Sequence, residues 1–509
     1  MHLTVQKKSS LFHILLLTGI ALVIPFLLFT VLNNCLTLWP LYTHSRIMLC
    51  ILTPLSFTGL FILKRYIARR QFGINRHLLL GFAAAFFCIQ LICALLLRHT
   101  PFTDTEQIVT ASVNLATTGA FETSPRSFQY FSWYPFNLGT VYVYAGLFRF
   151  LGIFGITDYY LIITVFASLL FTCGLICGTE NARILGGKTS ALLFLIFCSL
   201  CFPLYYCTSE LYTDALALPF PMITLYFFLQ SKKAAENGQR FIPWGILFAL
   251  SALLGYLFRV TTLIIPVACL ITALFDQKLR LFMACLTTCV CMLAAGNTLL
   301  EQANARHLGQ EQLSVHRLSV WHYLAMGLPA HEDEGYGQYG DGGWLILSTS
   351  FDDPVARDAR LRQEIKDRIY YLRYPNRMLN MLSRKNVSTF GDGTFHLNQL
   401  IEADEHEITN PLKALIYANG QGYAVFYHLC TALFYAEMLM AALTAFSDIR
   451  SGNIRTAPVF ISLVGAFIYL TLWETNARYF FMFVFILHLA CAIVPIKGER
   501  KTRPVNTDG

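Results

Sequence analysis

The sequence predicts an all-α polytopic membrane protein with about twelve transmembrane helices, an interfacial helix and a folded extracytoplasmic loop. Hydrophobic residues make up 55% of the 509 residues and charged residues only 13%, against about 25% charged in soluble proteins. The mean hydropathy is +0.52. A soluble protein of this length cannot bury so much apolar surface, so the composition excludes a cytosolic enzyme, a disordered chain and a fibre.

Apolar runs of the length needed to cross a bilayer, about 20 residues, occur along the whole chain. The first run, 11–32, follows Lys7 and Lys8, but it exceeds a signal-peptide core of about 7–15 residues and is interpreted as an anchor. Another apolar run, 136–152, carries Arg149 and several tyrosines and is interpreted as an interfacial helix. The predicted spans are 11–32, 46–63, 77–98, 158–178, 189–207, 214–230, 241–258, 260–275, 281–300, 419–446, 457–473 and 479–496.

Basic residues cluster between the spans, as they do in cytoplasmic loops. With 136–152 left outside the membrane, every cluster falls on the side of the N-terminus; counting it as a span would invert every later cluster. We therefore expect a multi-pass protein of the plasma membrane with both termini cytoplasmic, and the net charge of +8 does not indicate nucleic acid. The clusters cover 64–76, 183–188, 232–240, 278–280, 450–455 and 497–503.

Four segments follow from this topology. Residues 1–76 form two N-terminal transmembrane helices, and 77–300 form a transmembrane core whose first outer loop is 99–157. Residues 301–416 hold about half of the acidic residues and are expected to fold as an extracytoplasmic subdomain. Residues 417–509 form the C-terminal transmembrane helices and a cytoplasmic tail.

Two helices are expected outside the membrane. One covers 105–118, capped by Thr103 or Asp104 and ended by Gly119. The other covers 355–383, where apolar residues recur near helical spacing.

Candidate functional residues of the first outer loop are acidic and aromatic. Asp104 and Glu106 lie close to the membrane surface, although acids near a helix start also favour its positive N-terminus. The step Trp133-Tyr134-Pro135 precedes the interfacial helix, in a stretch whose other aromatics suit a membrane-interface belt.

Further candidates lie in the later outer turns. Glu210 and Asp214 lie between adjacent spans, where Asp214 can be an N-cap or the two acids can line a shared polar pocket. Arg259 lies in a tight turn, where it can extend to lipid headgroups or bind a phosphate. Glu474 and Arg478 are four residues apart and can pair with each other.

Three ionisable residues lie inside predicted spans: His428, Glu437 and His488. Each is isolated in the sequence, so interhelical hydrogen bonding is favoured over a proton path. Almost all of the 15 cysteines lie in apolar runs and are interpreted as small hydrophobic residues, with no zinc or disulfide spacing.

In this order and topology, the motifs resemble those of bacterial GT-C glycosyltransferases that use polyprenyl-phosphate sugars, the relatives of protein O-mannosyltransferases and of the aminoarabinose transferase of lipid A. The resemblance covers about 77–496. The chain departs from many relatives at Phe136-Asn137, where a second proline is common, and in its two extra N-terminal spans. The motifs are Asp104 with Glu106, Trp133-Tyr134-Pro135, Tyr212-Thr213-Asp214, Arg259-Val260-Thr261, and Trp473-Glu474 through Arg478-Tyr479. In the large loop, three further segments resemble those of Gram-positive members: Trp321 through Met326-Gly327-Leu328, Gly342-Gly343-Trp344, and Lys385 through Thr389-Phe390-Gly391-Asp392.

The resemblance implies transfer of a sugar from a polyprenyl-phosphate donor to a hydroxyl acceptor in a cell-envelope glycan, lipid or protein, on the extracytoplasmic face and with inversion. It implies that Asp104 is the catalytic base and that Arg259 and Arg478 hold the phosphate. No cofactor is required by this scheme, although the clustered acids can bind a divalent metal. The other expected substrate-binding residues are Glu106, Tyr134, Glu210, Asp214 and Glu474.

Three alternatives remain open on the sequence. They are a transporter or flippase for lipid-linked sugars, an O-antigen-type polymerase or ligase with a diphosphate-linked donor, and a non-catalytic scaffold. A transporter is expected to show internal repeats and charges near the membrane midplane, whereas this chain has no repeat and its charges lie toward the outer surface. The glycosyltransferase hypothesis requires that Asp104, Asp214 and Arg259 converge at the outer rim of the bilayer.

Overall fold

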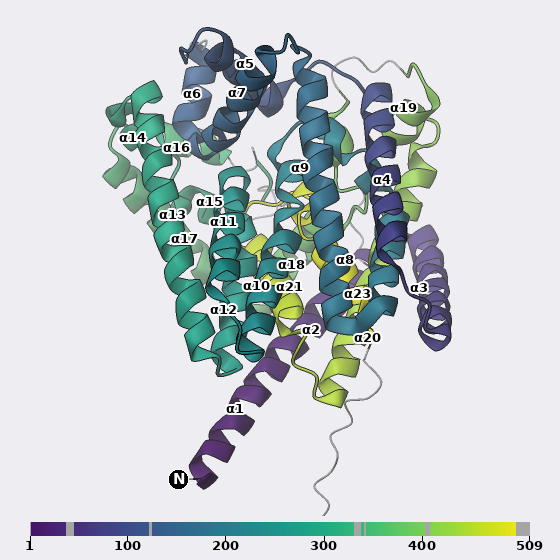
Figure 1. The fold of residues 1–509 in the computed structure, drawn as a ribbon. Coiled ribbons are helices and arrows are strands. Elements are labelled where there is room, and N and C mark those ends of the chain that lie inside the picture. The colour runs from purple at the N-terminus through teal and green to yellow at the C-terminus, as the bar shows by residue number, and fades with distance from the viewer. Residues whose placement is uncertain are drawn as a thin grey trace, which may run out of the picture.

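The computed structural model describes residues 2–36, 45–121, 125–329, 337–339, 343–402 and 408–494. In these ranges every regular element is a helix, which confirms the all-α class (Figure 1). Six of the described helices are long and apolar enough to cross a membrane, and shorter apolar helices cover 242–258, 260–275 and 457–472. The chain is therefore a multi-pass membrane protein, while the number of twelve spans stays a prediction.

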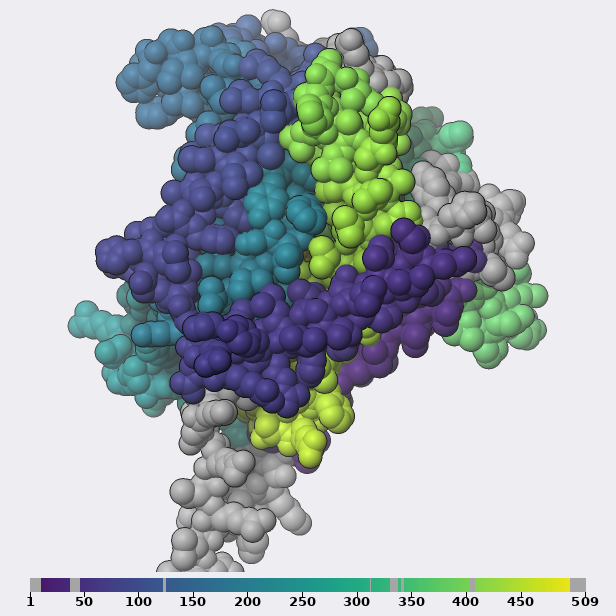
Figure 2. Space-filling view, turned by 90° about the vertical axis from the view of Figure 1, so that its right-hand side faces the viewer, coloured from purple at the N-terminus to yellow at the C-terminus, as the bar shows by residue number. Residues whose placement is uncertain are grey.

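The N-terminal helices lie against the C-terminal part of the bundle. α1 (His2–Ala21) and α2 (Val23–Leu36) cover the first predicted span, and α3 (Ser45–Arg70) covers the second. α3 packs on α20 (Tyr423–Ser451) and lies obliquely across this face of the molecule (Figure 2). The predicted basic cluster at 497–503 lies outside the described residues.

The first outer loop begins and ends at the same end of the bundle. It follows α4 (Arg76–Leu96) and precedes α8 (Tyr159–Leu200). Arg98, just after α4, forms an ion pair with Asp158, the N-cap of α8, at 2.9 Å. The segment 99–157 therefore does not cross the bundle, as expected if 136–152 is interfacial.

A layer of short helices covers this end of the bundle (Figure 1). We call it the outer end, because the charge pattern predicts that it faces outward. Gly119, with φ of +74°, follows the first helix of the layer, as predicted. The layer contains α5 (Thr103–Thr117), α6 (Pro125–Trp133), η1 (Pro135–Asn137) and α7 (Leu138–Gly152).

α8 covers the predicted span 158–178 and the first part of the predicted span 189–207, whose last residues lie beyond Leu200. Its 42 residues are interrupted at Gly187, whose φ of 82° and ψ of −174° are not helical. A residue with a Cβ is strained at that positive φ, so glycine permits the break. Two short 3₁₀ helices, η2 (Phe202–Tyr205) and η3 (Cys207–Glu210), connect α8 to the next helix.

The next predicted span, 214–230, is broken into two helices. α9 (Thr213–Ala217) and α10 (Phe220–Glu236) are separated at Pro219. α11 (Ile242–Phe258) packs on α10 and is followed by the single turn η4 (Val260–Leu263). α12 (Ile264–Phe275) and α13 (Leu279–Leu308) complete the core.

The described part of segment 301–416, which is expected to be extracytoplasmic, consists of helices joined by turns. The expected single helix over 355–383 is wrong, because Pro375 starts a new helix; proline lacks the N–H that a continuous helix needs. Leu361 and Leu372 of the predicted apolar stripe are buried, but Val355 and Ile369 are exposed. The helices are α14 (Gln310–His316), α15 (Val320–Met326), α16 (Trp344–Thr349), α17 (Pro354–Tyr371), α18 (Pro375–Phe390), η7 (Leu397–Leu400) and α19 (Pro411–Ile416).

Buried helices at the C-terminus form much of the core, with α20, α21 (Ala457–Leu472), α22 (Arg478–Phe481) and α23 (Val484–Ala492). His488 Nε2 lies 3.2 Å from Glu437 Oε2, so the expectation that these two residues are isolated is wrong. His488 Nδ1 also lies 3.6 Å from Cys198 Sγ. These contacts join α23 to α20 and α8, in agreement with interhelical hydrogen bonding.

Candidate active site

A cluster of charged side chains from three separate segments lies buried between the helices. Arg259 Nη2 donates a hydrogen bond to Asp214 Oδ2 at 2.5 Å. Arg478 Nε lies 3.8 Å from the same oxygen. The Asp214 side chain is 0% exposed, and the arginine side chains are 17% and 16% exposed. The structure therefore brings together three residues that the sequence analysis selected.

Local backbone structure places these side chains. Asp214 lies in the first turn of α9. Arg259 ends α11 in an extended conformation, with φ of −152° and ψ of 124°, and its carbonyl accepts a hydrogen bond from Thr262 Oγ1 at 2.8 Å. The backbone N–H of Arg478 donates to Asn476 Oδ1 at 3.1 Å. Each charged residue thus belongs to a short turn rather than to a long helix.

Two tyrosine rings flank both guanidinium groups. The Arg259 guanidinium carbon lies 5.5 Å from the ring centroid of Tyr212 and 5.1 Å from that of Tyr479. Arg478 lies 5.3 Å and 5.5 Å from the same two rings. These distances suit cation–π attraction. Because Arg259 points into this cluster, the alternative that it extends to lipid headgroups is wrong.

Asp104 lies beside the cluster, in the first turn of α5. Tyr212 Oη donates a hydrogen bond to Asp104 Oδ2 at 3.1 Å. The predicted cap is wrong: Phe102 is the N-cap of α5, without a side-chain hydrogen bond. The residues preceding the bonded pair, Thr103 and Leu211, have positive φ angles of 51° and 58°. Such strain is costly for residues other than glycine and is common at functional sites.

Glu106 is exposed and points away from Asp104, because residues two apart on a helix do not share a face. Among the described residues, the structure does not bring Glu106 to the charged cluster. The expectation that Glu106 binds substrate therefore gains no support, and its place in the first turn of α5 suits the helix N-terminus instead.

Two further carboxyl groups lie near the arginines. Glu210 is fully buried, and burial, followed by the nearby charge of Asp214, raises the pKa of its carboxyl well above the ordinary value. Burial also raises the pKa of Glu474, although a hydrogen bond from Tyr479 and the charge of Arg478 oppose that shift. Both shifts have burial as their largest cause, since removal from water disfavours the charged carboxylate.

The aromatic step of the first outer loop lies at the edge of the cluster. Tyr134 is half-buried at the N-cap of η1, near Tyr339 and Glu474. Burial, followed by hydrogen bonding to Tyr339, raises the pKa of the Tyr134 hydroxyl above its ordinary value.

Sequence reasoning missed three tyrosines of the site. Tyr212 and Tyr479 flank the arginines, and Tyr130 lies near Tyr212 and Asp104. The signal for the first two was their position inside the motifs that carry Asp214 and Arg478. Tyr130 accepts a hydrogen bond from Asn137 Nδ2 at 2.7 Å, a contact with no sequence signal.

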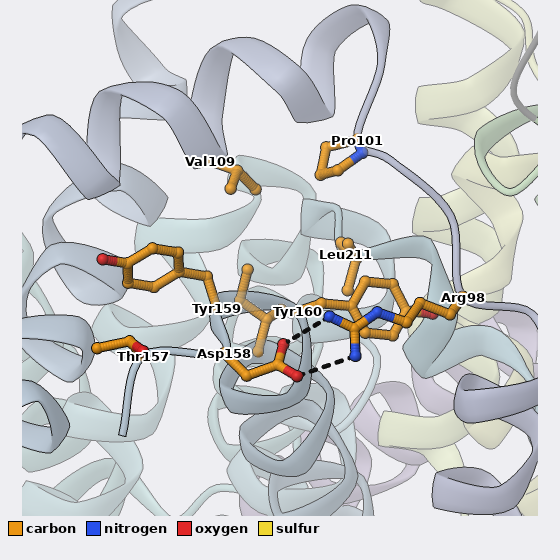
Figure 3. Close-up of a pocket in the computed structure, with 9 residues that line it drawn as sticks. Arg98, Pro101, Val109, Thr157, Asp158, Tyr159, Tyr160 and Leu211 are labelled. Atoms are coloured by element: carbon orange, nitrogen blue, oxygen red, sulfur yellow. Dashed lines mark hydrogen bonds and ion pairs between the residues drawn. The ribbon is translucent and has the colours of Figure 1, made fainter. Parts of the chain in front are cut away.

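A pocket of about 500 Å³ opens between α5 and the start of α8 (Figure 3). Arg98 and Asp158 form two hydrogen bonds across it, at 2.9 and 3.1 Å. Its wall includes parts of the segments that carry Asp104 and Tyr212. The lining residues are Arg98, Pro101, Val109, Thr157, Asp158, Tyr159, Tyr160, Ile163 and Leu211.

Within the described ranges, no three His, Cys, Asp or Glu side chains are grouped so that they could hold a metal ion. In the cluster, Asp214 contacts both Arg259 and Arg478. The arrangement can therefore bind an anion between two guanidinium groups and accept a proton at Asp104.

Comparison with known proteins places the chain in a family. Residues 8–496 match the family model described as "Conserved hypothetical integral membrane protein". Among solved structures, the chain is similar to ArnT from Cupriavidus metallidurans bound to undecaprenyl phosphate, with 13% identity, a TM-score of 0.37, and coverage of 82% of this chain and 78% of that chain. For the apo state of ArnT, the identity is 14%, the TM-score is 0.32, and the coverage is 81% and 77%. A comparison with curated proteins gives no match. Because the family model matches almost the full length, this chain is a member of the family of conserved hypothetical integral membrane proteins.

Proposed function

We propose that the chain is a membrane glycosyltransferase that moves a sugar from a polyprenyl-phosphate donor to a hydroxyl group of a cell-envelope glycan, lipid or protein. The observation that carries the proposal is the convergence of Asp104, Asp214, Arg259 and Arg478 at one site. The order of the sequence motifs, which resembles that of GT-C glycosyltransferases, supports the same function.

The two arginines form the phosphate side of the proposed site. Guanidinium groups suit phosphate oxygens because they donate several hydrogen bonds in a fixed plane. The Nε–H of Arg259 is buried and has no hydrogen-bond acceptor among the described residues, so donor capacity remains for an anion. Asp214 contacts both Arg259 and Arg478 and offsets one of their two positive charges, so the trio keeps a net positive charge for an anion.

Asp104 forms the acceptor side. Tyr212 occupies one carboxylate oxygen, Oδ2, which orients the group and leaves the other oxygen to receive a proton. A carboxylate placed in this way contributes about 10²–10⁴-fold to the rate of proton transfer.

The reaction is a single displacement. The acceptor oxygen bonds to the anomeric carbon while its proton passes to Asp104, and the bond from that carbon to the phosphate oxygen breaks. The electron pair leaves with the polyprenyl phosphate, whose charge Arg259 and Arg478 stabilise. Attack opposite to the leaving phosphate inverts the configuration at the anomeric carbon.

The pocket between α5 and the start of α8 is the proposed place of the acceptor. Its volume of about 500 Å³ and its rim of Arg98, Asp158 and Tyr159 combine hydrogen-bonding groups with an aromatic ring. Binding sites for small molecules commonly join apolar walls with a few polar groups in this way.

The decisive experiment compares the wild-type protein with Asp104→Asn in nanodiscs, supplied with polyprenyl-monophosphate sugars and cell-envelope extract. Mass analysis of the products should show transfer by the wild type and at least about a 100-fold loss in the folded variant. Asp276→Asn is the control, because Asp276 lies in the turn between α12 and α13 and pairs with Lys232 at 2.8 Å. The turn that joins these two helices lies at the opposite end of the bundle from α5 (Figure 1). Wild-type transfer by Asp104→Asn would contradict the proposal.

The same preparation separates the alternatives. Transfer from a diphosphate-linked oligosaccharide but not from a monophosphate sugar would favour a polymerase or ligase. Movement of lipid-linked sugar across liposomes without an acceptor would favour a transporter or flippase.

A further inference from the structure

A buried lysine contacts the turn that carries Glu474 and Arg478. Lys385 belongs to α18, in the extracytoplasmic segment, and is 2% exposed. Its Nζ donates hydrogen bonds to the backbone carbonyls of Gly327 and, at 2.7 Å, of Trp473. Trp473 directly precedes the turn that carries Glu474 and Arg478. The lysine therefore connects three segments, one of which supplies residues of the proposed site.

The extracytoplasmic segment contacts this turn closely at two further points. A Cβ at position 327 would overlap the carbonyl oxygen of Leu472, so glycine is required for the approach. The backbone N–H of Thr475 donates to the carbonyl of Gly337 at 2.8 Å. Gly337 has φ of +80°, a conformation that suits glycine.

An aromatic contact strengthens the same junction. The rings of Tyr323, in α15, and Trp473 stack with centroids 4.9 Å apart and an interplanar angle of 10°. Trp473 also stacks on Tyr469 of α21, at 5.1 Å. The start of the turn is thus held by a ring contact and by hydrogen bonds to its backbone.

We propose that Lys385 is a positioning residue, which holds the carbonyl of Trp473 and thereby sets the places of Glu474 and Arg478, so that the cluster binds an anionic lipid headgroup tightly. The inference rests on the proposed function, since it assumes that Arg478 binds the phosphate of the donor. A shift of about 1 Å in a binding group can cost about 100-fold in activity, so a carbonyl contact of this kind can control a site without touching the ligand.

The hydrogen-bonding capacity of the lysine supports an indirect role. A neutral amine has two N–H groups, and two carbonyl oxygens receive them. Burial lowers the pKa of Lys385 to about 7, although the charge of Glu474 opposes the shift. Either protonation state keeps both carbonyl contacts, and the buried Nζ acts on the site through the turn.

A second lysine provides a matched control. Lys64, in α3, donates to the backbone carbonyl of Cys491 at 2.6 Å and to Thr444 Oγ1 at 2.9 Å. It therefore links helices in the same way, but its partners belong to α20 and α23 and contribute no residue to the charged cluster.

The experiment measures binding of undecaprenyl phosphate to the full chain in nanodiscs for wild type, Lys385→Met and Lys64→Met. Tryptophan fluorescence gives the Kd, and thermal melting and size-exclusion chromatography define the folded fraction. Methionine keeps a long apolar side chain and removes the donors. We expect Lys385→Met to raise the Kd at least about tenfold, and Lys64→Met to lower the melting temperature while leaving the Kd within about twofold.

Two outcomes would overturn the role of Lys385. In one, folded Lys385→Met binds with the wild-type Kd; in the other, both methionine variants weaken binding equally, which would indicate general loosening. If wild type itself fails to bind undecaprenyl phosphate, the proposed function fails, and with it the inference. If Lys385→Met is not recovered in folded form, Lys385→Gln, whose shorter side chain reaches less far, is compared with Lys64→Gln by the same criteria.

Discussion

Replacement of Arg259 by methionine tests the phosphate side of the site most directly. The substitution keeps much of the apolar stem and removes the guanidinium that contacts Asp214 and lies between two tyrosine rings. If Arg259 binds the phosphate of the donor, Arg259→Met must lose affinity for undecaprenyl phosphate as well as transfer activity.

The structure sets the size of the expected loss. The Arg259 side chain is 17% exposed, so its hydrogen bonds to a phosphate are protected from water. A hydrogen bond involving a charged group contributes about 1.5–3 kcal/mol, which corresponds to about 10–150-fold in Kd. Removing one partner of a buried ion pair costs about 3–5 kcal/mol of folding free energy. We expect the lower end here, since Arg478 remains 3.8 Å from Asp214.

The assay is titration of undecaprenyl phosphate into nanodiscs that contain wild type, Arg259→Met or the control Arg317→Met. Arg317 also pairs with an acidic residue, Glu301, at 2.8 Å, but its side chain is 49% exposed, and such pairs contribute about 0–1 kcal/mol. The reasoning is refuted if folded Arg259→Met keeps the wild-type Kd, or if Arg317→Met loses as much affinity as Arg259→Met.

Three further predictions concern the carboxyl groups. Tyr212→Phe removes the hydrogen bond to Asp104, worth about 1 kcal/mol, and should lower kcat/KM about fivefold at unchanged donor Kd; an unchanged kcat/KM would exclude an orienting role. Glu106→Gln should keep transfer within about twofold, because the side chain is exposed and points away from Asp104; a loss comparable to that of Asp104→Asn would restore the sequence-based expectation. Glu210 has a raised pKa in the folded state, so the folded protein binds more protons than the unfolded chain above the ordinary pKa of the carboxyl. Its contribution to stability is full at acidic pH and disappears as the pH rises through the folded pKa. The melting temperature of the wild type should therefore fall between pH 5 and 9 more steeply than that of Glu210→Gln. Equal pH dependence of the two melting temperatures would contradict this expectation.

Individual residues show how much of the candidate site could be predicted from the sequence. Asp104 and Glu106 have the same chemistry and were selected together, but the helix of α5 turns Asp104 to Tyr212 and leaves Glu106 exposed. Arg259 had two open interpretations; its pair with Asp214 turns it into the charged cluster and away from lipid headgroups, while phosphate binding stays a prediction. Lys385 begins one of the loop segments that resemble the family, but its contacts could not be predicted, because its partners are backbone carbonyls, which any sequence provides.

The positions of the helices could also be predicted only in part. The apolar runs predicted the membrane helices because hydropathy is a property of consecutive residues. They did not reveal the break at Gly187 inside α8, or the division of 214–230 at Pro219. Pro375 was visible in the sequence, and giving it more weight would have corrected the expected helix over 355–383.

Composition, hydropathy and charge distribution were sufficient to establish an all-α, multi-pass membrane protein and to select Asp104, Asp214, Arg259 and Arg478 as candidates, because these signals depend on residue type and local order. Tertiary packing decided which candidates meet. Arg259 and Arg478 contact the same carboxylate oxygen of Asp214, because turns far apart in the chain are folded against each other. Such contacts depend on helix breaks, close glycine approaches and backbone hydrogen bonds, whose partners are distant in sequence and leave no periodic pattern there.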